Sequence, residues 1–229
     1  MADELKIYDE ITHEEIQDPD LERGYLYDGR IQVGMTEESS EIMEDTISER
    51  NPEGLKKIIP AKDIYEDCQY YHKYTEEEKE TYLNDKLSSL SNSCNEQITK
   101  GIEITLSDES KKTFSYSIED QANISEMFNA IVMGATSYPY HANGEGCKMY
   151  SAEDIVKIYS ALTALKTSQV TYYNQLREYA KTLEFVPDIQ SIVYGQELTG
   201  TYLETYNELM QNATTEMQKI LSRVSTLMS

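Results

Sequence analysis

The chain contains no tryptophan, only three phenylalanines and only three cysteines. The small number of cysteines limits the classes of protein to which it can belong. The cysteines (Cys68, Cys94 and Cys147) are odd in number and far apart, so they provide neither a disulfide framework nor paired zinc ligands, and reduced thiols in a cytoplasm are expected. No apolar run approaches the roughly 18 residues that a membrane span needs, and the first residues form no apolar signal core. We therefore expect neither a membrane span nor a cleaved signal peptide.

Basic residues are also scarce. The 20 Lys and Arg residues stand against 42 Asp and Glu residues, for a formal net charge of −22. Residues 1–80 alone hold 24 acidic and 9 basic side chains. Such a surface repels phosphate, so nucleic acids and membranes are not expected as partners. Protein partners remain, and the 19 tyrosines suit protein interfaces as well as cores. Solubility alone also explains an acidic surface.

Two seven-residue patterns fill the last third of the chain. Large or apolar residues recur in alternating steps of three and four, which places them on one helix face. The first pattern includes Ile155, Ile158, Leu162, Leu165, Tyr172, Leu176, Tyr179 and Leu183, and the second includes Leu203, Tyr206, Met210, Ala213, Met217, Ile220, Val224 and Leu227. Each face must be buried, against the other face or against another copy of the chain. All of these residues except Ala213 form the predicted oligomerisation surface.

Gln169 is the one polar residue that interrupts the first pattern. A buried polar side chain fixes register or oligomer number in some coiled coils. A local gap in the packing explains the interruption equally well.

The N-terminal part of the chain is predicted to be an extended arm, residues 1–33, that ends in a hairpin. Asp28-Gly29 is the expected turn between residues 24–27 and 30–33. Residues 36–54 are acidic and poor in apolar side chains, which is typical of a linker or a surface loop. The arm is the predicted docking element, and the side chains that it offers to a partner are Tyr8, Leu21, Tyr25, Tyr27 and Ile31.

The middle of the chain has more regular signals. Residues 64–71 alternate as a strand does, and the acidic run that follows Thr75 is typical of a short helix start. Residues 102–106 and 113–116 are expected to form a second hairpin. Ser117 with Asp120 predicts the capped start of one helix, and Ser151 with Asp154 predicts the start of another of about 30 residues.

Few residues indicate chemistry. His141 and Cys147 lie six apart in a glycine-rich loop, a spacing that suits a thiolate and imidazole pair or half of a metal site. No other Cys or His lies near them in sequence, and turns alone explain the glycines. The acidic residues between Glu37 and Glu49 lack the order of a calcium loop. We predict no catalytic, cofactor-binding or metal-binding residue.

The stretch from residue 101 to residue 183 carries a resemblance to a known group of proteins. The segments that carry it are Gly101-Ile102-Glu103-Ile104-Thr105-Leu106-Ser107-Asp108, Phe114-Ser115, Asp120-Gln121-Ala122-Asn123-Ile124, Tyr140-His141-Ala142-Asn143-Gly144, Cys147-Lys148-Met149-Tyr150-Ser151-Ala152-Glu153-Asp154 and Tyr172-Tyr173-Asn174. It resembles an uncharacterised domain found in tail-module proteins of tailed phages and prophages of Gram-positive gut bacteria. The resemblance implies a hairpin, a capped helix and a long helix in that order, and a place beside tail-fibre and baseplate proteins.

Together these signals predict an α+β fold that is mainly α. Its parts are an extended arm and acidic linker (1–62), a strand and short helix as connector (63–100), and a hairpin and helix unit followed by long amphipathic helices (101–229), paired as a helical hairpin or coiled coil. The first functional hypothesis is a non-enzymatic structural component of a phage tail, made in the bacterial cytoplasm and carried in the virion. It would dock on other tail proteins by its arm and form a homo-oligomer by its helices. The alternative is a tail-fibre assembly chaperone that leaves before maturation, and a cysteine hydrolase is the third class considered.

Overall fold

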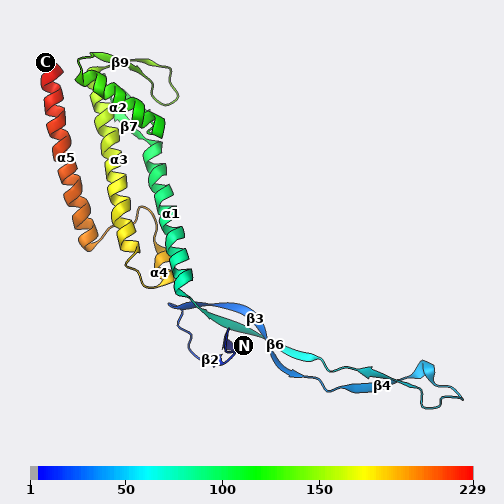
Figure 1. Cartoon of the computed structure of the whole chain (residues 1–229). Helices are drawn as coiled ribbons and strands as arrows, with labels where there is room; N and C mark the ends of the chain where they lie inside the picture. Colours follow the sequence, from blue (N-terminus) through cyan, green and yellow to red (C-terminus); the bar gives the residue numbers. More distant parts are fainter. Residues whose placement is uncertain (1–4, 229) are drawn as a thin grey trace. The chain divides into compact units, whose positions relative to one another are not determined.

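The computed structural model describes residues 5–228, and it divides the chain into two compact units, residues 1–76 and 77–229. The fold is mixed α/β, with 48% helix and 25% strand, five helices and several small sheets (Figure 1). The predicted fold class was therefore wrong. The described residues show neither a helix-dominated hairpin nor a coiled coil, and most of the supposed N-terminal arm and linker is paired strand.

The N-terminal unit is built on a four-stranded sheet in the order β2-β1-β6-β3. β1 runs parallel to β6, and the other neighbours are antiparallel. The strands are β1 (Ile7–Asp9), β2 (Glu15–Ile16), β3 (Gly24–Met35) and β6 (Asp63–Lys73). The longest ladder of the molecule joins β3 to β6, two strands that are far apart in sequence.

The turn predicted at Asp28-Gly29 was wrong. β3 passes straight through these residues, and Gly29 pairs with Cys68 of β6. A Cβ on Gly29 would lie 2.5 Å from the ring of Tyr70, so the glycine provides room for a cross-strand aromatic ring. A turn dipeptide is a local signal, and the long ladder with β6 outweighs it.

The linker predicted over residues 36–54 was also wrong. β4 (Ser39–Met43) and β5 (Leu55–Ile59) form an antiparallel pair, and a short 3₁₀ turn, Glu44–Thr46, lies at its end. The amide of Thr36 donates to the carbonyl of Lys62 at 2.8 Å, which joins this pair to the β3 and β6 ladder. We call residues 36–62 the ribbon.

The C-terminal unit consists of helices and two small hairpins. The helices are α1 (Glu76–Lys100), α2 (Ile118–Val132), α3 (Ala152–Ala180), α4 (Val186–Ser191) and α5 (Gly200–Met228). The hairpins are β7 (Ile102–Thr105) with β8 (Lys111–Phe114), and β9 (Ser137–Tyr140) with β10 (Lys148–Ser151). α1 is much longer than the short helix expected after Thr75.

Several local predictions in this unit were confirmed. The hairpin of residues 102–114 forms, and Ser117 and Asp120 make a reciprocal capping box at the start of α2. The side chain of Ser151 accepts from the amide of Asp154 at 3.1 Å and starts α3. Asp154 also accepts from the amide of Ser107 at 2.7 Å, so one carboxylate links the first hairpin to the start of the long helix.

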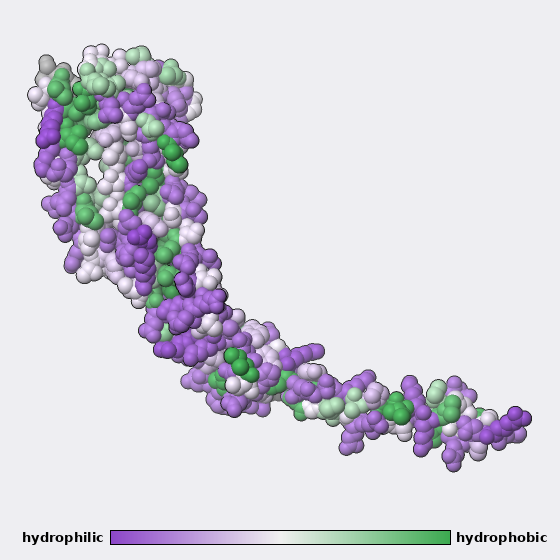
Figure 2. Space-filling model, in the orientation of Figure 1, coloured by the Kyte–Doolittle hydropathy of each residue, from purple (hydrophilic) through white to green (hydrophobic). Residues whose placement is uncertain are grey.

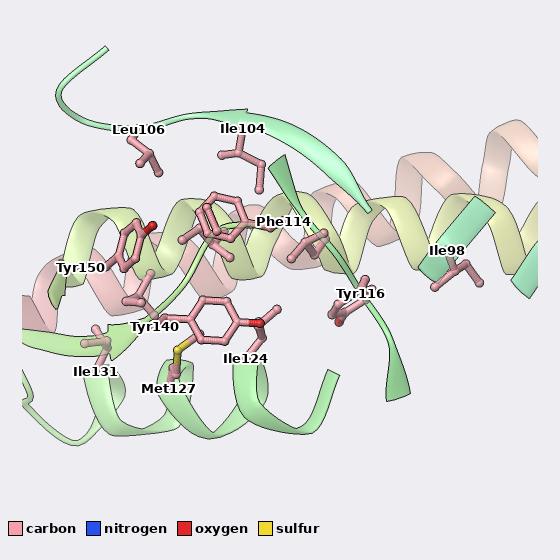
Figure 3. Packing of buried hydrophobic residues seen from close by; sticks show 14 of the residues in the cluster. Ile98, Ile104, Leu106, Phe114, Tyr116, Ile124, Met127, Ile131, Tyr140 and Tyr150 are labelled. Carbon is pink, nitrogen blue, oxygen red and sulfur yellow. The ribbon is translucent and has the colours of Figure 1, made fainter. Parts of the chain in front are cut away.

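The main core lies where α1, α2, α3 and both hairpins meet (Figure 3). It consists of Cys94, Ile98, Ile104, Leu106, Phe114, Tyr116, Ile124, Met127, Ile131, Tyr140, Ala142, Tyr150, Ile155, Ile158 and Leu162. Burying one large apolar side chain of this kind stabilises a fold by roughly 1.5–3 kcal/mol. A second cluster joins α1 and α3 to the segment after α4, with Leu90, Leu176, Ala180, Ile192 and Leu198.

Candidate functional site

Four of the five predicted docking residues share one face of the N-terminal sheet. Tyr8 and Tyr27 both pair with Tyr70, and partners in a ladder point to the same side. Because the side-chain period of a strand is two, Tyr25 and Ile31 lie on that side as well. Leu21 is separate from them. It is exposed in the loop before β3.

Aromatic rings gather on this face. The ring of Tyr25 lies 5.0 Å from that of His72 and 5.5 Å from that of Tyr74, and the rings of Tyr27 and Tyr70 are 5.7 Å apart. His13 continues the row at 5.7 Å from Tyr70. We call these six residues the aromatic row. Tilted aromatic pairs at such distances stabilise a fold beyond what the burial of their surface contributes, and they stiffen this side of the sheet.

Glu10 ties the aromatic row to the segment after β1. Its Oε1 lies 2.5 Å from Nδ1 of His72, and its Oε2 accepts from the hydroxyl of Tyr27 at 3.1 Å. Desolvation, and then the bond to Glu10, raises the pKa of Tyr27, so this phenol keeps its proton. One carboxylate therefore bridges β3 and β6.

The ribbon has a different character, because its apolar side chains face solvent. Leu55 is 59% exposed and Ile58 is 65% exposed, and Ile42 and Ile47 are exposed as well. Figure 2 shows apolar patches along the ribbon between polar ones. A two-stranded ribbon is marginal in water on its own. The ribbon therefore leaves apolar side chains in solvent without a core of its own beneath them.

Several strands of the N-terminal unit also have an unpaired edge. β3 is the last strand of its sheet, and β4 and β5 pair only with each other among the described residues. An unpaired edge presents free backbone donors and acceptors that a further strand can pair with. Only one irregularity, at Gln32 to Gly34, interrupts the ladder that β3 forms with β6.

The predicted oligomerisation residues are used mainly inside the chain. Ile155, Ile158, Leu162 and Leu176 of α3 are fully buried in the two cores. Leu165 packs against the first core, and Tyr172, Tyr179, Leu183 and Tyr206 pack against the second. α3 and α5 approach each other within one chain, where Ser168 Oγ lies 2.9 Å from the hydroxyl of Tyr206. The helix faces that carry the two seven-residue patterns, which we call the α3 and α5 stripes, therefore meet within one chain over part of their length.

The seven-residue pattern predicted for α5 was only partly right. Met210, Met217 and Val224 lie on the inner side, whereas Leu203, Ile220 and Leu227 are exposed. The residues that are at least half covered recur in steps of four, four and three; they are Tyr202, Tyr206, Met210, Ala213, Met217, Leu221 and Val224. An 11-residue repeat has about 3.67 residues per turn, whereas the seven-residue repeat that imposes a left-handed supercoil has about 3.5. The covered face of α5 therefore does not follow the repeat of a left-handed coiled coil.

The loop of His141 and Cys147 belongs to the C-terminal unit. It connects β9 to β10, and both side chains are exposed. The His141 ring stacks on that of Tyr140 at 5.1 Å, and Cys147 carries a free thiol. Within the described residues no cluster of three or more His, Cys, Asp or Glu side chains could hold a metal ion.

Sequence reasoning missed two parts of the candidate site. It missed the ribbon, because residues 36–62 contain Pro and Gly breakers and many charges. It also missed the β6 half of the aromatic row, although the alternation of residues 64–71 indicated a strand. β6 pairs with β3, which lies about 40 residues earlier in the chain, and local sequence patterns do not reveal a pairing between such distant segments.

The fold and the site together define an α/β protein with a helical unit and an exposed β ribbon. Residues 81–192, which cover most of α1 and continue through α4, match the family model of a domain of unknown function, DUF4376. No curated protein and no solved structure matches the chain. In the described part of the chain, no helix combines the length and apolar character needed to span a membrane.

Proposed function

We propose that this protein is a non-enzymatic structural component of a phage tail, at the baseplate or at the fibre attachment. In this proposal the N-terminal unit docks the chain onto a neighbouring tail protein, and the helical unit supports it. The protein is made in the host bacterial cytoplasm and stays in the virion tail.

The observation that carries the proposal is the ribbon. Ile42, Leu55 and Ile58 leave apolar surface in solvent on an element that has no core of its own. The surrounding charge argues for a protein partner, because a chain of net charge −22 repels phosphate-rich surfaces. The resemblance of residues 101–183 to tail-module proteins supports a place in a phage tail.

Strand addition is the mode of docking that this geometry favours. The edge of β3 can accept an extended segment, and backbone hydrogen bonds would then provide affinity while alternate side chains provide selectivity. The aromatic row would flank such a segment, with Tyr25 and Tyr27 each 40% exposed. Contacts between copies of the chain would use the outer side of α5, where Leu209, Ile220 and Leu227 are exposed.

A ribbon deletion tests the proposal. Residues 37–61 are replaced by Asn-Gly, so that β3 and β6 remain joined by a tight hairpin turn. The variant should keep the amide protection of the helical unit and should be absent from purified particles by quantitative mass spectrometry. If the variant enters particles at the wild-type copy number, the ribbon does not dock the protein.

The alternative function is a tail-fibre assembly chaperone, which the strongly acidic surface also suits. The wild-type chain separates the two functions. A fixed copy number in purified particles supports the structural component, whereas presence in the infected cell and absence from particles supports the chaperone.

A further inference from the structure

A second surface lies in the helical unit and is independent of the tail proposal. A pocket of about 330 Å³ opens between α1, α3, α5 and the segment after α4. It is lined by Gln97, Ser168, Gln169, Tyr172, Tyr194, Gly195 and Tyr206. Gln169, the polar residue that interrupts the first seven-residue pattern, therefore lies at a local gap in the packing, as one of the two sequence interpretations expected.

The tyrosines of the pocket are held in place by their hydroxyls. Tyr172 donates to the carbonyl of Gln196 at 2.7 Å and accepts from the amide of Gly195 at 2.9 Å. Tyr194 donates to Oε1 of Gln169 at 2.7 Å. The Tyr172 ring stands almost perpendicular to those of Tyr194 and Tyr206, with interplanar angles of 79° and 89°. The aromatic walls are therefore rigid before any ligand arrives.

Polar groups in the pocket remain available for a ligand. Gln169 uses its oxygen for Tyr194, and among the described residues nothing accepts from its Nε2. The side-chain amide of Gln97 is exposed and likewise unbonded within that part of the chain. The Ser168 and Tyr206 hydroxyls share one hydrogen bond, which leaves one hydroxyl hydrogen free.

The pocket is electrically neutral in a chain of which 27% is charged. No acidic or basic side chain lines it, and burial raises the pKa of the Tyr172 and Tyr194 phenols. Phosphate and carboxylate ligands would find no cation here. A quaternary ammonium ion would find aromatic faces but no carboxylate, and it would leave the glutamine amides unused.

We propose that this pocket binds one neutral pyranose ring of a glycan. Such a ring offers C–H faces to the tyrosine walls and hydroxyls that both donate to and accept from the free amide and hydroxyl groups. Rigid aromatic walls with a few fixed polar groups are the usual composition of a small-molecule site. We expect a weak Kd, on the order of 1 mM, for a monosaccharide in this open pocket.

The test uses the full chain and the methyl glycosides of glucose, galactose and N-acetylglucosamine as probes. Saturation-transfer NMR should detect at least one of them, and titration should give its Kd. Gln97→Ala and Tyr206→Phe should each weaken binding by about two- to tenfold, the usual effect of one lost hydrogen bond. Asn95→Ala, at another exposed position of α1, should leave the affinity unchanged.

Three outcomes would overturn the proposal. The first is the absence of binding by every glycoside while the chain is folded. The second is binding that neither Gln97→Ala nor Tyr206→Phe weakens, because the sugar would then lie elsewhere. The third is binding of choline chloride without binding of any glycoside, which would make the pocket a cation site.

Discussion

The ring of Tyr70 lies over the backbone of Gly29, so close that a Cβ on the glycine would be 2.5 Å from two ring carbons. The Tyr70 hydroxyl donates to the carbonyl of Arg30 at 3.0 Å, which fixes the ring in this position. Glycine in a strand interior usually weakens the strand. Here it allows one aromatic ring to cross the β3 and β6 ladder.

Gly29→Ala is therefore expected to destabilise the N-terminal sheet by about 1–3 kcal/mol, since the added methyl group displaces the Tyr70 ring. Hydrogen exchange of the β3 and β6 amides measures the loss locally. Gly34→Ala is the matched control in the same strand, because a Cβ added there would meet no atom within 4 Å and the backbone is not left-handed. Equal exchange rates in the two variants would show that the ring does not depend on the glycine.

Much of the C-terminal unit could be predicted from the sequence, and most of the N-terminal unit could not. The hairpin of residues 102–114 and the caps at Ser117 and Ser151 are local, since each depends on residues a few positions apart. The β3 and β6 ladder joins segments about 40 residues apart near Gly29. A local turn signal at Asp28-Gly29 therefore gave the wrong partner for β3.

The helix patterns illustrate a second limit. Alternating steps of three and four correctly place Ile155, Ile158 and Leu162 inside, because a short stretch does not distinguish a repeat of about 3.5 residues from one of about 3.6. Over the whole of α5 the difference accumulates. Ile220 is then rotated outward, and Leu221 lines the hollow of about 290 Å³ between α3 and α5.

Two neighbouring substitutions in α5 test this geometry. Leu221→Asp should lower the free energy of unfolding by about 1–3 kcal/mol, because it places a charge against the α3 surface. Ile220→Asp should cost less in the dissociated chain, since Ile220 is 39% exposed and its aspartate can reach solvent. Urea unfolding followed by far-ultraviolet circular dichroism compares the two. The seven-residue pattern predicts the opposite order.

Asp120 links the start of α2 to the hairpin of β9 and β10. Burial alone would raise its pKa, but bonds from Ser115, from Ser117 and from the Tyr140 hydroxyl outweigh burial and lower it. A depressed folded-state pKa stabilises the fold above the unfolded value of 3.8, and this contribution is lost as the pH falls through the folded value.

Asp120→Asn should cost about 1–2 kcal/mol at pH 7, because it weakens the capping box and a charge-assisted bond. The variant should also lose less stability than the wild type as the pH falls below 3.8, since it has no carboxylate to protonate there. Thermal unfolding at pH 7 and at a series of pH values below 3.8 measures both effects. Glu126→Gln, on an exposed position of the same helix, serves as the control and should retain the wild-type slope.

The loop of His141 and Cys147 allows a direct test of the non-enzymatic proposal. Cys147→Ser and His141→Ala, made separately, should leave particle assembly and infectivity within a few-fold of wild type, because both side chains are exposed in a turn. Plaque counts and particle mass spectrometry measure this. Loss of infectivity by either variant, with normal incorporation, would favour catalysis, where removing one member of a pair costs orders of magnitude.

The ribbon provides the most direct test of docking. Ile58 is 65% exposed on β5, and its cross-strand partner is Ser40, so Ile58→Ser removes apolar surface without opening a core. The stability of the purified protein should stay within about 0.5 kcal/mol of wild type. Its copy number in particles should fall several-fold, because a partner would lose a buried isoleucine worth roughly 1.5–3 kcal/mol.

Ile11→Ser is the matched control, since Ile11 is even more exposed but lies outside the ribbon, in the turn after β1. It should leave both stability and copy number unchanged. If Ile11→Ser lowered incorporation and Ile58→Ser did not, the docking surface would lie at the sheet and the proposed role of the ribbon would be wrong. If neither variant lowered it, exposed apolar side chains of the N-terminal unit would not hold the protein in the tail. The edge of β3 would then be the remaining route, and a proline at a β3 position whose amide faces away from β6 would test it by removing one backbone donor.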